Sequence, residues 1–345
     1  MNSGKQRFHG PDILRGGACS AIVFFHLYLI SGVKFSSNIW MIVSQFGMAV
    51  PLFYIISAFS IYYNYFNKIN TLEDIGYFIK RRFFRLAPLF YFMLIIHIII
   101  SKYFFNNIFS SLDLLGSILF IYPMIPHMQE GIVWASWSIG LEWLFYLVFP
   151  VILVFLRDKK LLVFIFTLIF IYIHVLILNR SADKEFYMNF ITQLCFFLEG
   201  ILLAQCVSLI KQGVKQHFYI ILFFNIIMVI IYFVYLNSII NSTIFYCLLF
   251  CCLMCNSLTD IPRWLDNVVT RFVGVRSYSI YLLHPVVIFI YSKMNFYIWI
   301  CYWGGLGWKS FIICGTITLI TVYAISIYTY RFIERPGMAM FKFLR

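Results

Sequence analysis

Long apolar runs constrain this chain more than any other feature. Each run extends over about 20 residues, the length that an α-helix needs to cross a bilayer. Strands of a membrane barrel would be nearer ten residues long and would alternate apolar and polar side chains. Only helices and closed barrels satisfy their backbone hydrogen bonds in lipid, so the runs predict an all-α membrane protein. The predicted spans are 13–33, 40–62, 86–104, 138–156, 161–178, 191–210, 218–236, 243–258, 277–294 and 311–330.

Composition supports the same fold class. The 345 residues are 63% hydrophobic and only 11% charged, more apolar surface than a soluble domain of this length can bury. We therefore expect a polytopic helical bundle of about ten transmembrane helices, forming one membrane domain over residues 1–345. The first run has no small-x-small cleavage pattern after it, so we expect it to be retained. The apolar piece 112–122 is too short to cross and is expected to be re-entrant or interfacial.

The positions of lysine and arginine predict the orientation of these spans. With the N-terminus inside, 20 of the 26 Lys and Arg residues fall on the cytoplasmic side, as the positive-inside rule requires. An even number of spans then places the C-terminus in the cytoplasm as well. The net charge of +13 is thus mainly a topology signal that also attracts anionic lipid. No module or basic stripe indicates a nucleic-acid partner.

Two ionisable residues lie in the first span. Arg15 and His26 are 11 residues apart, so they project from nearly the same helix face, roughly 16 Å apart along the axis. A charge at the centre of a membrane helix costs at least about 2.5–3.5 kcal/mol, which indicates that this stripe lines a polar path. The alternative is that Arg15 extends to the headgroups and His26 is a hydrogen-bonded core residue.

An arginine pair precedes the third span. Arg82 and Arg85 are three residues apart and share a helix face at the cytoplasmic surface. Such a cluster is often a membrane anchor, but Arg15 enters from the same side. Three guanidiniums at one mouth would suit a phosphate-rich ligand, because arginine binds phosphate oxygens in a bidentate way. A coenzyme A thioester is the obvious cytoplasmic candidate.

An intramembrane carboxylate opens the fourth span. Glu142 and His26 both lie within the outer half of the bilayer by the rise per residue, so His26 is the expected partner of Glu142. A carboxylate beside an imidazole would raise its basicity, as a general base for a hydroxyl acceptor requires. The alternative is that Glu142 is a protonated or Trp-bonded structural group. Ser57 in the second span could face a ligand or bond a backbone carbonyl freed by Pro51.

Other polar positions have simpler interpretations. His284, followed by Pro285, is expected to be a second polar element of the same path. The isolated side chains His97, His174 and Glu199 are interpreted as structural. Cys251, Cys252 and Cys255 lack further ligands for a zinc site, and no metal is implied. Glu334 is expected to form a surface ion pair with Arg331 or Arg335 that ends the last helix before Pro336.

Several of these stretches together resemble the acyltransferase-3 family of integral membrane acyltransferases. The likeness runs from residue 14 to 336, in the family's order and spacing. The matching elements are Arg15 with His26 (Arg-x10-His), Tyr54 to Phe59, Arg82 with Arg85 (Arg-x-x-Arg), Trp137-Ser138 with Glu142, Ser277 to His284 including Tyr278, and the ending Phe332 to Pro336.

The resemblance implies ten core helices and transfer of an acyl group, usually acetyl from acetyl-CoA, without a permanently bound cofactor. The acceptor would be a hydroxyl of a surface polysaccharide (O-antigen, capsule or exopolysaccharide) or of its lipid-linked precursor, such as an undecaprenyl-linked saccharide. The chain departs from the pattern in having Ala58 for a glycine and a single carboxylate, Glu142, where many relatives have two. It matches the short form without an extracytoplasmic hydrolase-like domain.

The combined hypothesis is an O-acetyltransferase of the bacterial inner membrane. Arg15, Arg82 and Arg85 would hold the CoA phosphates, and the thioester would pass Ser57. His26, oriented by Glu142, would deprotonate the sugar hydroxyl or carry the acetyl group itself. Trp137, Ser138, Tyr278 and His284 would line the acceptor path, with Trp137 stacking on a sugar or anchoring the interface. The rival is a transporter or flippase of lipid-linked saccharides, although no duplicated halves are found.

Overall fold

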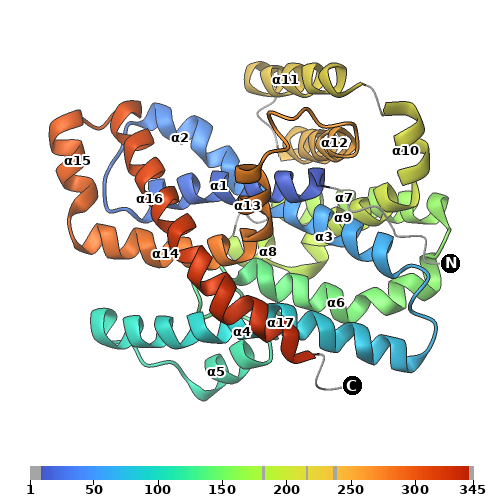
Figure 1. Ribbon diagram of the computed structural model, residues 1–345, viewed down its shortest axis with the longest axis horizontal. Helices are drawn as coiled ribbons and strands as arrows, with labels where there is room; N and C mark the ends of the chain where they lie inside the picture. The colour runs from blue at the N-terminus through green and yellow to red at the C-terminus, as the bar shows by residue number, and fades with distance from the viewer. Residues whose placement is uncertain (1–8, 181–182, 215–216, 236–238, 342–345) are drawn as a thin grey trace.

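The computed structural model is helical throughout, and it describes residues 9–180, 183–214, 217–235 and 239–341, in which it has no strand. Figure 1 labels the helices along the chain. The helices are α1 (Gly10–Ile30), α2 (Ser37–Val43), α3 (Ala49–Tyr65), α4 (Leu72–Phe105), α5 (Ser111–Ile118), α6 (Trp137–Leu156), α7 (Lys160–Arg180), α8 (Lys184–Tyr187), α9 (Phe190–Gln205), α10 (Val207–Val214), α11 (Phe218–Tyr235), α12 (Ile239–Ser257), α13 (Val268–Val275), α14 (Ser277–Lys293), α15 (Phe296–Gly304), α16 (Trp308–Thr329) and α17 (Arg335–Met340), with short turns η1 (Ser44–Met48), η2 (Tyr122–Met124) and η3 (Tyr330–Glu334).

Each of the ten predicted spans falls on helix, which confirms the all-α polytopic fold class. Seven helical segments are long and apolar enough to cross a membrane, and an eighth is the pair α13 and α14, bent by 75°. The remaining two, α11 and α12, are apolar but shorter within the described residues. The predicted cytoplasmic location of both termini stays a prediction. The piece 112–122 forms α5 and leads into η2.

Helix α4 begins 14 residues before its predicted span. A capping box at Thr71 and Asp74 starts it, because each side chain accepts a hydrogen bond from the other's backbone N–H. The basic cluster at 80–85 therefore lies inside a 34-residue helix, in agreement with the helix face that Arg82 and Arg85 were expected to share. Helical periodicity consequently determines which of these arginines face the bundle interior.

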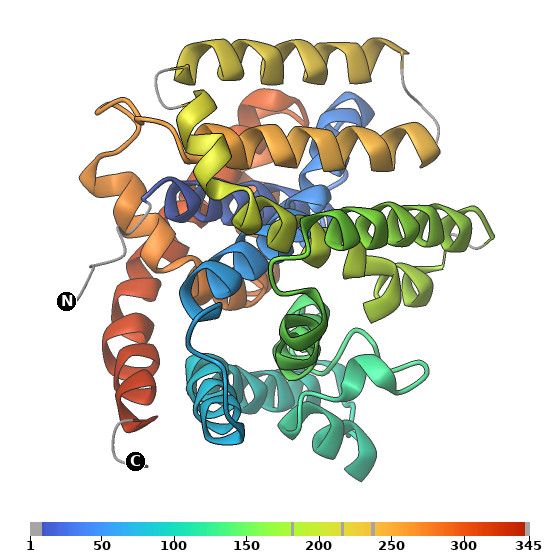
Figure 2. The same cartoon turned by 90° about the vertical axis from the view of Figure 1, so that its right-hand side faces the viewer.

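The helices pack around two hydrophobic cores. In both Figure 1 and Figure 2, α11 and α12 form one edge of the molecule, and α4 with α5 forms the opposite edge. The larger core lies between these edges. The smaller one joins the C-terminal end of α1 to α2, α14, α15 and α16, around the fully buried Leu27, Ile39 and Tyr297. Residues on α1 therefore contact both cores.

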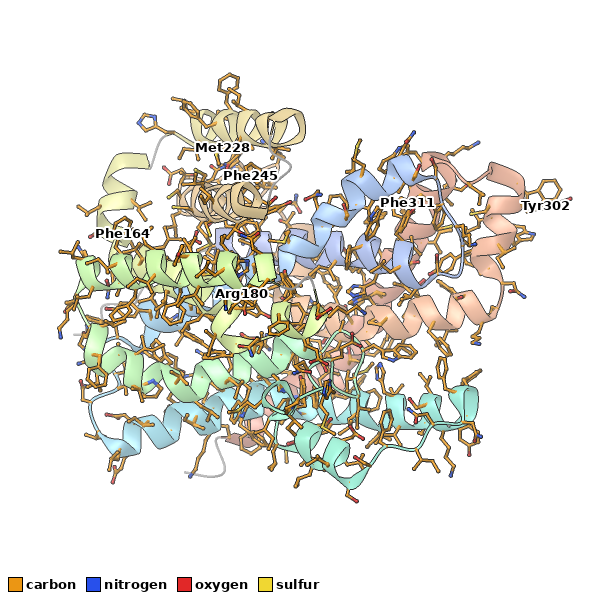
Figure 3. The ribbon with its side chains drawn as sticks, turned by 180° about the vertical axis from the view of Figure 1, so that it is seen from behind. Phe164, Arg180, Met228, Phe245, Tyr302 and Phe311 are labelled. Atoms are coloured by element: carbon orange, nitrogen blue, oxygen red, sulfur yellow. The ribbon has the colours of Figure 1, made fainter. Side chains whose placement is uncertain are left out.

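Large apolar side chains cover much of the surface. Figure 3 shows Tyr302 of α15 pointing away from the bundle, whereas Phe311 of α16 lies among other side chains; their exposed fractions are 79% and 1%. On α7 the outward side chains include Phe164, Ile165 and Leu168. Apolar surface of this extent on a water-soluble monomer would be unusual, but it is the expected surface of a helix that faces lipid.

Helices α3 and α9 approach closely at Gly200. A Cβ atom placed on Gly200 would lie 2.3 Å from the carbonyl oxygen of Ile55 and 2.9 Å from the Cβ of Ala58. Ala58 is the position at which the family pattern has glycine, and here the glycine on the facing helix provides the space. Small residues at such crossings let membrane helices pack backbone to backbone.

Gly200→Val is therefore expected to destabilise the protein by about 1–3 kcal/mol, because backbone atoms of α3 would have to move. Thermal unfolding in detergent measures this effect. Gly76→Val is the matched control: Gly76 is also helical, but a Cβ there meets nothing within 4 Å. Equal unfolding temperatures for the two variants would contradict close packing at Gly200.

Candidate active site

Seven of the ten predicted site residues line one cavity of about 370 Å³, which we call the inner cavity. It lies between α1, α3, α4, α6 and α14. The seven are Arg15, Ser57, Arg82, Arg85, Ser138, Glu142 and Tyr278. Residues separated by up to 263 positions in the sequence thus line the same cavity.

Glu142 belongs to this inner cavity and binds two hydroxyl groups there. Ser57 Oγ, from α3, donates to Glu142 Oε1 at 2.5 Å. Tyr146, one turn further along α6, donates its hydroxyl to the same oxygen. The predicted pairing of Glu142 with His26 is therefore wrong. The two side chains project into different cavities.

His26 instead pairs with the second predicted histidine. Its Nδ1 lies 3.0 Å from Nε2 of His284 and 3.2 Å from the carbonyl oxygen of Ile22. His284 is fully buried, so His26 is the member of the pair that reaches open space. A neutral imidazole has one N–H and one lone pair. The carbonyl oxygen of Ile22 can only accept, so in the tautomer that makes this bond Nδ1 of His26 carries the proton and Nε2 carries the lone pair.

His26 lines a second cavity, of about 690 Å³, which we call the outer cavity. Its walls are mainly apolar and aromatic, with Trp134 and Trp137 among them, and Glu130 and Lys184 are its charged members. The inner and outer cavities have no lining residue in common. The adjacent residues Trp137 and Ser138 face one cavity each.

A hydrogen-bonded layer separates the two cavities. The Tyr281 hydroxyl donates to the carbonyl oxygen of Ala135 at 2.8 Å and pairs with Ser138 Oγ at 2.8 Å. The Tyr281 ring also contacts the ring of His284, at 5.7 Å between centroids. The predicted continuous polar path is therefore, in this structure, two cavities divided by Tyr281.

The three arginines of the inner cavity have different partners. The guanidinium of Arg82 lies over the rings of Tyr65, Phe78 and Tyr146, at 5.1, 5.6 and 5.4 Å from their centroids. No carboxylate of the described chain pairs with it. Its charge therefore remains available to an anionic ligand.

Arg85 and Arg15 are already engaged. Arg85, whose side chain is half-buried, forms an ion pair with the buried carboxylate of Glu334, which also accepts a hydrogen bond from Ser279 at 2.6 Å. Arg15 lies 3.4 Å from Asp12 and donates from Nη2 to Ser60 Oγ at 3.3 Å. Among the predicted phosphate ligands, Arg82 thus has the best-placed free charge.

The predicted surface ion pair of Glu334 is wrong, since its side chain is only 1% exposed. The last helix does not end before Pro336 either. A π-helical turn, η3, connects α16 to α17, and the proline is the second residue of α17. This extra turn carries Glu334 inward to Arg85.

A third cavity, of about 490 Å³, adjoins the inner one through Arg82 and Arg85. We call it the entry cavity. It adds Lys68 and Arg81 and the aromatic residues Tyr77 and Phe341, whose rings contact at 4.6 Å between centroids.

Further contributors were identifiable from spacing alone. Tyr146 follows Glu142 by four residues, and Tyr281 precedes His284 by three, so each shares a helix face with a predicted residue. The structural interpretation of His97 and His174 agrees with their Nδ1 contacts to the carbonyl oxygens of Met93 and Thr192, at 2.8 and 2.7 Å. No group of three metal-ligating side chains occurs in the part of the chain that the structure describes.

These features define a multi-pass membrane protein that holds one basic, carboxylate-containing cavity and one histidine-containing cavity. A family model described as an acyltransferase domain matches residues 8–329, nearly the whole chain. The chain therefore belongs to the acyltransferase-3 family and is a membrane acyltransferase. No curated protein and no solved structure matches it.

Proposed function

We propose that this acyltransferase moves an acetyl group from cytoplasmic acetyl-CoA to a hydroxyl of a cell-surface polysaccharide or of its lipid-linked precursor, in the bacterial inner membrane. The observation that carries the proposal is the division of the site into two compartments. The inner cavity combines free positive charge with a Ser57–Glu142 pair, and the outer cavity presents His26. Two separate compartments suit a donor and an acceptor that arrive from opposite sides of a membrane.

The donor compartment has the chemistry of coenzyme A. The entry cavity gathers Lys68, Arg81 and Arg82, whose charges suit the phosphates of the nucleotide. Tyr77 and Phe341 are flat apolar faces for its adenine. The pantetheine arm would extend from there into the inner cavity, so that the thioester arrives beside Ser57 and Glu142.

The acceptor compartment suits a saccharide hydroxyl. In it, Nε2 of His26 is the nitrogen free to take a proton, because Nδ1 is engaged by His284 and Ile22. Trp134 and Trp137 line the same cavity and offer faces on which a sugar ring packs. The transporter alternative finds no support, because the matched family is one of acyltransferases.

The proposal can be tested with membranes that contain the protein. The membranes are supplied with acetyl-labelled acetyl-CoA and with polysaccharide from cells that lack the protein. We expect the label to enter the polysaccharide as an alkali-labile ester. If cells that lack the protein still acetylate the polysaccharide but no longer export it, the protein is a transporter instead.

Arg82→Gln is expected to raise the KM for acetyl-CoA by about 10- to 100-fold, because one charge-assisted contact to phosphate is worth about 1.5–3 kcal/mol. Initial rates over a range of acetyl-CoA concentrations measure it. Arg271→Gln is the control, since Arg271 is an exposed residue that pairs with Asp266 and lines none of the three cavities. An unchanged KM in Arg82→Gln would exclude Arg82 as a phosphate ligand.

A further inference from the structure

Ser57 has an unusual hydrogen bond for a serine inside a membrane helix. Such hydroxyl groups commonly bond the carbonyl four residues earlier, as Ser20 does to Gly16 at 2.8 Å and Thr167 does to Val163 at 2.7 Å. Ser57 in α3 is as buried as Thr167, but its hydroxyl is directed across to Glu142 of α6 at 2.5 Å. A hydroxyl within hydrogen-bond distance of a carboxylate, on a cavity wall, is the arrangement of a nucleophile and its general base.

The groups around this pair complete the arrangement. Tyr146 donates to the same carboxylate oxygen and so orients the base. Arg15 donates from Nη2 to the carbonyl oxygen of Ile56 at 3.4 Å and to Ser60 Oγ at 3.3 Å. These two contacts lie on either side of Ser57 in the sequence. The positive charge of Arg15 thus lies on the same cavity as Ser57, where it would favour negative charge on a thioester oxygen under attack by Ser57.

The position of Ser57 also matters relative to His26. A thioester in the inner cavity meets Ser57 and Glu142 on the same side of the divide, whereas His26 faces the outer cavity. Tyr281 and its bond to Ser138 lie between them. If a side chain of the inner cavity carried the acyl group, CoA could leave before the Tyr281–Ser138 layer opens to the acceptor.

We propose that Ser57 is a catalytic nucleophile that carries the acyl group as an ester, an inference that rests on the proposed use of acetyl-CoA. Ser57 Oγ attacks the thioester carbonyl carbon, and Glu142 takes the hydroxyl proton. The carbon–sulfur bond then breaks and the sulfur receives that proton, which leaves acetyl-Ser57 and free CoA. The acceptor hydroxyl, assisted by His26, attacks the ester carbonyl, and the Ser57 oxygen regains the proton that the acceptor loses.

The test uses the purified full-length protein with acetyl-labelled acetyl-CoA and no acceptor. Mass spectrometry of its proteolytic fragments is expected to find an acetyl ester on Ser57, with about one CoA released per protein molecule. Glu142→Gln is expected to slow this labelling by about 10²–10⁴-fold, the usual contribution of a general base. Ser20→Ala serves as the matched serine control and is expected to label like the parent protein.

Ser57→Cys distinguishes a nucleophile from a packing residue. It is expected to retain labelling, but as a thioester that neutral hydroxylamine releases, whereas the serine ester requires alkaline hydroxylamine. Label on His26 instead of Ser57, or undiminished acetyl transfer by a folded Ser57→Ala variant, would overturn the inference and leave the acyltransferase proposal intact. A parent protein that neither becomes labelled nor transfers acetyl to any acceptor would overturn both.

Discussion

His26→Gln is expected to lower the rate of acyl transfer to the acceptor by about 10²–10⁴-fold, the usual contribution of a positioned general base. Glutamine retains hydrogen-bonding capacity toward His284 and Ile22, but it has no nitrogen lone pair at the position of Nε2. Transfer of labelled acetyl to polysaccharide measures the effect. On the relay proposed above, His26→Gln should still form acetyl-Ser57, because His26 faces the other cavity.

His174→Gln is the matched control for this experiment. His174 is a buried histidine, with 1% of its surface exposed. Like His26, it contacts a backbone carbonyl oxygen through Nδ1. It lines none of the three cavities. Comparable losses of activity in the two variants would show that the effect of His26 is structural.

Arg85→Met is expected to lower the free energy of unfolding by about 3–5 kcal/mol, the usual cost of removing one partner from a buried ion pair. Glu334 would remain with 1% of its side chain exposed and, among the residues that the structure describes, with Ser279 as its remaining hydrogen-bond donor. Denaturation of the detergent-solubilised protein measures the loss.

The double variant Arg85→Met/Glu334→Leu is expected to recover most of that stability, because replacing both charges with apolar groups removes the unpaired carboxylate. This recovery separates an ion pair from a phosphate ligand. The opposite outcome is an Arg85→Met variant that has the stability of the parent protein and a raised KM for acetyl-CoA. That outcome would show that Arg85 is a phosphate ligand, as its motif predicts.

Membership of a common site was predictable from the sequence, but the partners within it were not. The helical rise places Arg15, His26 and Glu142 along the bilayer normal from residue number alone. It says nothing about how α6 is rotated relative to α1. In the packed bundle, Glu142 accepts hydrogen bonds from Ser57 and Tyr146, and His26 contacts His284.

The end of the chain illustrates the same limit. Pro336 normally indicates that a helix stops, and a charged residue beside it is normally exposed. The π-helical turn at Tyr330–Glu334 continues the helix instead and turns Glu334 toward α4. A tertiary contact, the buried pair with Arg85, thus accompanies a local conformation that the local sequence does not favour.

The sequence by itself determined the helical membrane fold and the residues from which the site is built. Both follow from local chemistry. Backbone groups in lipid must form hydrogen bonds within their own helix, and ionisable side chains in membrane helices are energetically costly, so they usually mark a functional site. Only the tertiary structure decided that the site is two cavities divided by Tyr281. Which side chains pair across helices depends on how each helix is rotated and where it ends, and these are properties of the packed bundle as a whole.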